Sequence, residues 1–283
     1  PPYSSAASDV YKRQPLTSNN SLTQAYFGNS CSMNNDGTIF IAGAYKHYGD
    51  YGAALIYKYD DLASQWNKIG QIDGTASSQE LGRSVAINGD GTIIAIASPG
   101  QSRVDVYEYS GNGTQWNPLS STNLSEGIRQ VGGDSVSIND DGTIVAVNDY
   151  VGGKSYIYQY NSGTTWDEIG ELASGQSNDA YSDQNASISL NKAGNIVAVG
   201  STSSTSNKGT VKIYRYSSGT SWTLMQTFTG VSSNEKIGFS VSLNGNGNIV
   251  AFSREYLIYG GQVQVWEYSN SDMTDGGSWS QLD

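Results

Sequence analysis

Five acidic residues in predicted loops are the first candidates for chemistry in this chain of 283 residues. They are Glu80, Glu126, Asp134, Asp179 and Asp183. Two carboxyl groups about 5 to 10 Å apart can hydrolyse a glycosidic bond, one as the acid and the other as the base or nucleophile. Acidic loop residues are usually solvated, and no motif holds two of these at that distance. The carboxylates therefore predict no catalytic pair, and we expect the protein not to be an enzyme.

Tyrosines in loops of variable length form a second group of candidates, together with the single histidine. A tyrosine ring can stack on a sugar or anchor a protein contact, and its hydroxyl group can form a hydrogen bond. The ligand-binding candidates are Tyr45, His47, Tyr48, Tyr51, Tyr150, Tyr181, Tyr256 and Tyr259. The alternatives are that the rings only cover the edges of sheets and that His47 is an ordinary surface residue.

Composition excludes several classes of site and partner. A single Cys31 and a single His47 exclude a disulfide framework and a metal site with several histidines. We expect Cys31 to be a small buried core residue. The chain has 15 basic and 26 acidic residues, a net charge of −11, so we expect no nucleic-acid or membrane-surface partner. No apolar run reaches the length of about 20 residues that spans a bilayer, so no membrane insertion is expected.

A repeat of about 52 residues organises the chain. Glycines of a predicted turn recur at intervals of 51 to 54 residues, at Gly37, Gly91, Gly142, Gly194 and Gly247. An aromatic pair follows each turn, as in Tyr107-Glu108-Tyr109, and a tryptophan such as Trp116 follows each pair. Three landmarks that recur five times in one order indicate five copies of one structural unit.

Each repeat predicts four short antiparallel strands. In the second repeat, residues 84–88 alternate between apolar and polar and end at an Asn-x-Asp-Gly turn, residues 92–97 are apolar, and residues 104–109 alternate again. No stretch has the period of a capped helix. Four strands per repeat indicate an all-β fold, a β-propeller of five four-stranded antiparallel blades. A β-solenoid is the main structural alternative.

The repeat resembles FG-GAP repeats, which build the seven-bladed head of integrin alpha chains. Phe27-Gly28 and Ile237-Gly238 are the best copies of the first half of that motif, and Gly43-Ala44-Tyr45 is a degraded copy of the second. The resemblance implies an extracellular or cell-surface protein, and a ring that is either five-bladed or a fragment of a seven-bladed one. A fragment would expose apolar blade faces and self-associate.

The turns depart from the calcium-binding loops of that family. They are short, as in Asn88-Gly89-Asp90-Gly91, and offer one or two carboxylates where Ca²⁺ prefers six to eight oxygen ligands. We therefore expect them to be hairpin turns, and we expect no metal and no cofactor. Asn112, Asn123 and Asn185 lie in Asn-x-Ser/Thr sequons and are possible sites of N-glycosylation.

The expected domain organisation has two parts. Residues 1–25 are a non-native or disordered tail, and residues 26–283 are the propeller, with repeats near 26–79, 80–130, 131–182, 183–235 and 236–283. Residues 3–14 resemble adapter read-through, so we expect the true N-terminus and any signal peptide to lie outside this sequence.

These observations favour a non-enzymatic recognition or adhesion protein that binds a glycan or a protein. Variable loops on a rigid repeated scaffold are where propellers usually bind, so we expect Tyr45, Tyr48, Tyr51 and Tyr259 to form one contact patch, provided that the ring closes. One alternative is a secreted hydrolase or an accessory domain of one. Another is a structural subunit of a surface layer or fibre.

Overall fold

The computed structural model confirms the predicted all-β propeller architecture. It describes residues 25–120, 131–149, 153–173, 186–202, 207–255, 260–270, 273 and 276–282. The strands of these residues form five four-stranded sheets, and each sheet is an antiparallel meander in which the strands pair in chain order. Each sheet is one blade, numbered from the N-terminus.

The first two blades each contain one short helical segment. The first consists of β1 (Cys31–Met33), β2 (Ile39–Gly43), β3 (Ala53–Asp60) and β4 (Gln65–Asp73), with α2 (His47–Asp50) between β2 and β3. The second consists of β5 (Ser84–Ile87), β6 (Ile93–Ser98), β7 (Arg103–Tyr109) and β8 (Trp116–Pro118), with the 3₁₀ turn η2 (Pro99–Gln101) between β6 and β7.

The other three blades have the same strand order. The third consists of β9 (Val131–Ile138), β10 (Ile144–Asp149), β11 (Lys154–Ser162) and β12 (Thr165–Ala173). The fourth consists of β13 (Ala186–Leu190), β14 (Ile196–Ser201), β15 (Thr210–Ser218) and β16 (Ser221–Thr229). The fifth consists of β17 (Ile237–Leu243), β18 (Ile249–Arg254), β19 (Gln262–Tyr268) and β20 (Trp279–Leu282).

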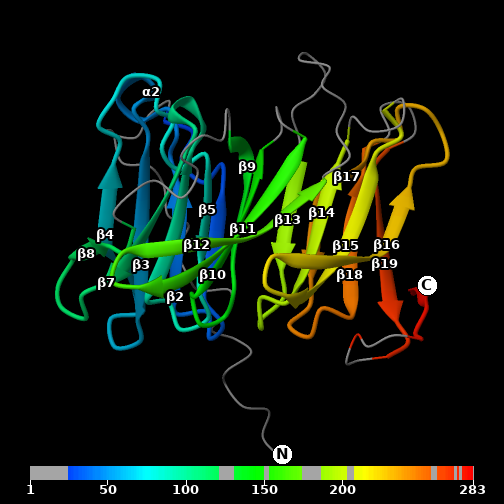
Figure 1. Cartoon of the computed structure of the whole chain (residues 1–283). Helices are drawn as coiled ribbons and strands as arrows, with labels where there is room; N and C mark the ends of the chain where they lie inside the picture. Colours follow the sequence, from blue (N-terminus) through cyan, green and yellow to red (C-terminus); the bar gives the residue numbers. More distant parts are fainter. Residues whose placement is uncertain are drawn as a thin grey trace, which may run out of the picture.

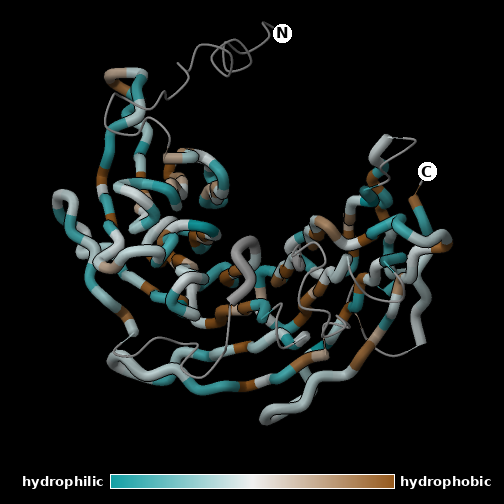
Figure 2. The backbone as a smooth tube through the Cα atoms, turned by 90° about the horizontal axis from the view of Figure 1, so that it is seen from above, coloured by the Kyte–Doolittle hydropathy of each residue, from teal (hydrophilic) through white to brown (hydrophobic). Residues whose placement is uncertain are grey.

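The blades stand side by side around an arc, in chain order from the blue to the red end of the molecule (Figure 1). The first strands of successive blades, β1, β5, β9, β13 and β17, pack against one another along the inside of the arc. Seen from above, the arc is open between the first and the fifth blade (Figure 2). The described residues therefore form an open ring.

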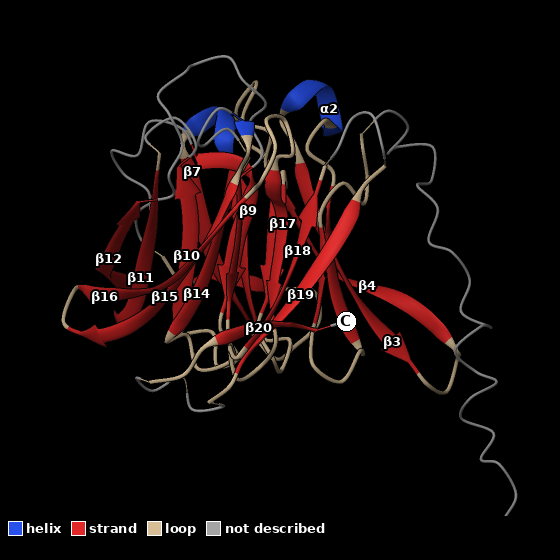
Figure 3. Cartoon of the chain, turned by 90° about the vertical axis from the view of Figure 1, so that its right-hand side faces the viewer, coloured by secondary structure: helices blue, strands red, loops and turns tan. Residues whose placement is uncertain are grey.

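The strands run between two faces that differ in their connections (Figure 3). The described connections between second and third strands, 44–52 with α2 and 99–102, lie on one face together with the described connections between blades, 74–83 and 230–236. This face is here called the loop face. The short turns between the first and second strands lie on the other, here called the hairpin face. The loop face therefore carries the more varied part of the chain.

The hydrophobic core is divided among the contacts between neighbouring blades. Ile41 and Ile56 of the first blade are fully buried against Ile94 and Ile96 of the second. Equivalent clusters join the second blade to the third, the third to the fourth and the fourth to the fifth. The second strands of the middle three blades are buried on both sides, as their apolar runs predict, whereas β18 of the fifth blade is only partly buried.

The repeated tryptophan ties the second, third and fourth blades each to the blade before it, whereas the indole nitrogen of Trp279 in the fifth blade has no hydrogen-bond partner among the described residues. The indole N–H groups of Trp116, Trp166 and Trp222 donate to the carbonyl oxygens of Ile69, Leu119 and Ile169, at 3.2, 3.2 and 2.9 Å. A Cβ on Gly70 or Gly170 would lie 2.3 or 2.4 Å from the indole nitrogen. The rings of Trp116 and Trp222 therefore require a glycine at this point of the neighbouring blade, whereas the equivalent residue next to Trp166 is Ser120.

The repeated asparagine before each turn serves the turn itself. The side-chain oxygen of Asn88, which is buried, accepts from the backbone N–H groups of Thr92 and Ile93, both at 2.9 Å. Asn34, Asn139, Asn191 and Asn244 accept in the same way from the start of their second strands. Gly91 has a φ of 81°, which confirms the predicted left-handed turn.

Cys31 corrects one expectation, because its side chain is exposed and not part of the core. Its equivalents in the other blades, such as Val85 and Val136, are buried by the preceding blade. The first blade follows no other blade in the described structure. Alternation of residues along a strand predicts which face a residue occupies, and it does not predict whether another blade covers that face.

The close approach between blades predicts unequal effects of two glycine substitutions. Gly82 and Gly111 have similar φ values, 86° and 78°, but a Cβ on Gly82 would lie 2.3 Å from the Ala53 carbonyl oxygen, whereas one on Gly111 meets nothing within 4 Å. We expect Gly111→Ala to lower the free energy of unfolding by about 1 to 2 kcal/mol. Gly82→Ala should cost ~1 to 3 kcal/mol more, because it also overpacks the blade contact. Equal losses in urea unfolding would contradict this packing.

The tyrosines buried between blades predict a loss of stability in alkali. Burial raises the pKa values of Tyr57, Tyr107, Tyr158 and Tyr214 above the ordinary value of 10.0. Their contribution is complete below the pKa of the unfolded chain, about 10, and is lost as the pH rises through the folded pKa. The melting temperature should therefore fall above pH ~10. Tyr158→Phe removes the ionisable hydroxyl group, so the melting temperature of this variant should fall less above that pH. If the variant and the wild type lose stability equally in alkali, the burial of Tyr158 does not contribute to the loss.

Candidate functional site

Two connections on the loop face, 44–52 and 74–83, are joined where the first and second blades meet. Gly52 and Leu81 form a parallel bridge, and the N–H of Glu80 donates to the Asp50 carbonyl oxygen at 2.9 Å. Gly52 has a φ of 85°, and a Cβ there would lie 2.3 Å from the Leu81 backbone nitrogen. A glycine is therefore required at this crossing, which brings residues about 30 apart in the sequence into contact.

Four charged side chains form a network on these two connections. Lys46 Nζ lies 2.8 Å from Glu80 Oε1 and 3.3 Å from Asp50 Oδ1, and Arg83 Nη1 lies 3.7 Å from Glu80 Oε2. The hydrogen bond to Glu80 raises the pKa of Lys46. The Glu80 carboxylate is thus held between two cations, and about a quarter of its side chain, 24%, remains accessible to solvent.

Aromatic rings border the charged network. The Tyr45 ring is buried, and the Arg83 guanidinium lies 4.5 Å from its centroid, a cation–π distance. The His47 and Tyr48 rings are 4.0 Å apart, and Tyr48 is 73% exposed. The site therefore combines two carboxylates, two cations, an imidazole and an exposed ring on two joined connections, here called the blade 1–2 junction.

His47 differs from the ordinary surface residue considered as its alternative. It is only 3% exposed, because the turn of α2 folds the ring inward beneath Tyr48, and the backbone of Tyr48 and Gly49 takes left-handed angles. Gly49 in the sequence Tyr48-Gly49-Asp50 indicates the left-handed turn, since glycine favours such angles. The sequence does not indicate that this turn buries the imidazole of His47.

The structure brings together only part of the predicted set. Tyr45, His47, Tyr48 and Tyr51 lie on one connection of the first blade. Tyr150, Tyr181, Tyr256 and Tyr259 lie outside the described residues, as do Glu126, Asp179, Asp183, Asn123 and Asn185. The first and fifth blades stand on opposite sides of the opening, so the patch that needs a closed ring stays a prediction (Figure 2). Asp134 corrects a further expectation, because it lies within strand β9 and not in a loop. Of the five candidate carboxylates, Glu80 is the one whose side-chain contacts are described.

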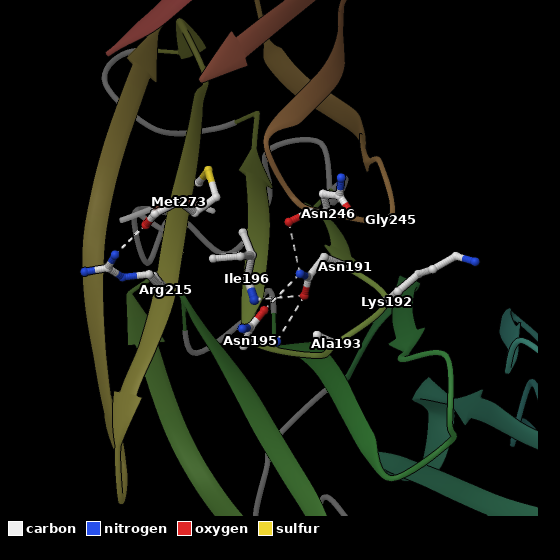
Figure 4. Close-up of a pocket in the computed structure, with 9 residues that line it drawn as sticks. All are labelled: Asn191, Lys192, Ala193, Asn195, Ile196, Arg215, Gly245, Asn246 and Met273. Atoms are coloured by element: carbon white, nitrogen blue, oxygen red, sulfur yellow. Dashed lines mark hydrogen bonds between the residues drawn. The ribbon is translucent and has the colours of Figure 1, made fainter. Parts of the chain in front are cut away.

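A pocket lies on the hairpin face between the fourth and fifth blades (Figure 4). The pocket has a volume of about 390 Å³, and Lys192, Arg215 and Asn246 are among its polar lining residues. Arg215 donates to the Met273 carbonyl oxygen, and Asn191 donates to that of Asn246 at 3.3 Å. No carboxylate or imidazole is among its lining residues, so this pocket can hold an anion but contains no general base of that kind.

A buried polar pair lies between the third and fourth blades. Asn148 and Ser155 are partners in the β10–β11 register, and both are fully buried. Neither side chain has a hydrogen-bond partner among the described residues. Such groups usually cost stability. They adjoin 150–152, outside the described residues, and we assign them no role.

The described ranges contain neither clustered metal ligands nor a membrane-spanning helix. No cluster of three or more His, Cys, Asp or Glu side chains in these ranges is arranged to hold a metal ion. No helix in them has the length and apolar character needed to cross a membrane.

The fold resembles solved β-propellers. A candidate 6-phosphogluconolactonase from Bacteroides uniformis matches with a TM-score of 0.59 and 12% identity, over 90% of this chain and 70% of that one. The periplasmic gluconolactonase PpgL of Pseudomonas aeruginosa matches with a TM-score of 0.56 and 13% identity, over 96% and 73%. The Cps50 (Swd1) propeller domain of Myceliophteria thermophila matches with a TM-score of 0.56 and 11% identity, over 90% and 71%.

These similarities establish the β-propeller fold and correct the functional expectation. No protein-family model matches the chain, and no curated protein sequence is similar to it. The expectation of a non-enzymatic adhesion protein, and of no enzyme activity, is contradicted, because solved propellers of this shape include lactonases. The error lay in inferring a function from a repeat, since one fold carries many functions. The hydrolase alternative is better supported.

The charged network predicts a measurable coupling between Lys46 and Glu80. Both side chains are partly exposed, so the pair should contribute about 0.5 to 1 kcal/mol, less at high salt. A double-mutant cycle with Lys46→Met and Glu80→Gln in urea unfolding measures this term. Strictly additive effects of the two substitutions would show that the pair is not formed in solution.

Proposed function

We propose that this protein is a hydrolase whose reaction site is the blade 1–2 junction, and that its substrates are lactones of small sugar acids. The observation that carries the proposal is the partly exposed carboxylate of Glu80, held between Lys46 and Arg83, with the Tyr45 ring against both cations. The gluconolactonase and the candidate 6-phosphogluconolactonase with similar folds support the substrate class.

Hydrolysis of a lactone needs a base for water and a positive charge near the carbonyl oxygen. In the proposed reaction, Glu80 accepts a proton as a water molecule attacks the carbonyl carbon. Lys46 and Arg83 stabilise the negative charge that develops on the carbonyl oxygen. The ring C–O bond then breaks, and the proton held by Glu80 passes to the ring oxygen. The product is the open hydroxy acid, so one water is consumed and no other co-reactant is needed.

The surroundings of the network suit a small polar substrate. The exposed ring of Tyr48 offers a flat apolar surface for the face of a sugar. Lys46 and Arg83 balance the carboxylates of Glu80 and Asp50, so the network is neutral within a protein whose net charge is −11. A neutral site within an acidic surface therefore suits an uncharged lactone better than an anion.

Two further proposals concern the type of repeat, FG-GAP, and the location of the protein, which is extracellular or at the cell surface. The FG-GAP resemblance is supported by Gly28, Gly82 and Gly238, which share φ values of 84°, 86° and 85° at one point of the repeat. An extracellular or cell-surface location is supported by Asn112, whose sequon lies in an exposed turn after β7. FG-GAP propellers also accompany some secreted hydrolases, so both proposals agree with the enzymatic one.

The test is hydrolysis of gluconolactone followed by acid release in a pH-stat. The wild-type protein should hydrolyse it above the spontaneous rate, and Glu80→Gln should lower kcat about a hundredfold. Glu108→Gln, an exposed glutamate on the outside of β7, is the matched control and should leave the rate unchanged. A wild-type rate equal to the spontaneous rate, or full activity in Glu80→Gln, would overturn the proposal.

A further inference from the structure

The fifth blade exposes a face that every other blade buries. One position near the start of the third strand faces the next blade, and it is occupied by Ala54, Val104, Ser155 and Val211 in the first four blades. All four residues are 0% exposed. The fifth residue at this position is Val263, which is 69% exposed. The fifth blade therefore ends the arc with an uncovered contact surface.

The first blade exposes the opposite face. The last residue of its first strand, Met33, is 54% exposed, whereas its equivalents Ile87 and Leu190 are buried by the preceding blade. Cys31 on the same strand is also exposed. The two open surfaces are thus the two complementary halves of the contact that joins blades within the chain.

Hydrogen bonds between hairpins show the same complementarity. The N–H groups of Asn35, Gly89, Asp140 and Lys192 donate to the carbonyl oxygens of Gly89, Asp140, Lys192 and Gly245, at 2.8 to 3.0 Å. Each hairpin thus donates to the next. Within the described residues, this ladder leaves the Gly245 N–H as a donor at one end and the Asn35 carbonyl oxygen as an acceptor at the other.

Serine side chains form a second ladder along the first strands. The N–H groups of Ile87, Leu190 and Leu243 donate to Ser32, Ser137 and Ser189 of the preceding blade, at 3.2, 3.0 and 3.0 Å. The equivalent acceptor on the fifth blade is the exposed Ser242, and the equivalent donor on the first blade is the N–H of Met33. Neither of these two groups is paired within the described structure.

We propose that the fifth blade of one copy of this chain binds the first blade of a second copy, which continues the contact between blades. Gly245 N–H donates to the Asn35 carbonyl oxygen of the second copy, and Ser242 accepts from its Met33 N–H. Val263 is covered by the strand that carries Met33 and Cys31. Both ladders run in the required direction. The occupant is a second copy because the same chain carries both matching halves.

The contact joins two different surfaces and is therefore heterologous. A copy whose fifth blade is covered still has a free first blade, so further copies can bind. Both copies are acidic, and their repulsion should weaken association at low ionic strength. This inference concerns the ends of the arc and is independent of the proposed reaction at the blade 1–2 junction.

Sedimentation velocity of two single variants tests the proposal. Val263→Arg blocks the fifth-blade surface, and Met33→Arg blocks the first-blade surface. Both side chains are exposed in the single copy, so the melting temperatures should stay near that of the wild type. Leu224→Arg, which changes an exposed apolar residue on β16, is the matched control.

The wild type and Leu224→Arg should associate with increasing concentration, more strongly at higher salt. Each blocked variant alone should associate at least about tenfold more weakly. An equimolar mixture of the two blocked variants should form a dimer and nothing larger, because it contains one matching pair of ends. A wild type that stays monomeric, association of either blocked variant at the wild-type strength, or a mixture that forms no dimer would overturn the proposal.

Discussion

The structure depends on one constraint: a four-stranded blade has two apolar faces and must bury both against other blades. The buried side chains are divided among the contacts between neighbours and form no common centre. The tryptophan N–H bonds, the hairpin ladder and the serine ladder all cross these same contacts. Stability in this molecule is therefore a property of pairs of blades, as expected for a repeat architecture.

The blade contact also positions the candidate site. The crossing of Gly52 with Leu81 places Glu80 beside Lys46, and the crossing of Gly209 with Ile237 repeats this backbone between the fourth and fifth blades. Glu80 and Lys236 occupy the same point of the two crossings, with φ values of 55° and 49°. The left-handed backbone of Glu80 is thus a feature of the repeat. What distinguishes the blade 1–2 junction is its set of side chains.

Much of the fold could be predicted from the sequence because its landmarks serve local needs. The asparagine and glycine of the turn, such as Asn88 and Gly91, satisfy backbone groups within five residues, so they recur at a fixed period. Cys31 was misplaced because its burial depends on a preceding blade, and none precedes it in the described residues. An alternating pattern contains no information about whether another blade covers the strand.

The candidate site was less predictable, for reasons of distance along the chain. Lys46 and Glu80 are 34 residues apart and meet only through the crossing of two connections. The tyrosines around His47 were recognisable as one loop, but the cations beside Glu80 were not. The expectation of adhesion failed for another reason: a repeat specifies the fold, whereas the chemistry depends on the side chains of the loops.

Hydrogen–deuterium exchange of the hairpin amides tests most directly whether contacts between blades organise the molecule. In a dilute, monomeric sample the N–H groups of Asn35, Gly89, Asp140 and Lys192 should exchange slowly, because each donates to the next hairpin. The Gly245 N–H, which occupies the same position at the end of the ladder, should exchange fast. Fast exchange at all five positions, or equal protection of Gly245, would contradict a structure built from successive blade contacts.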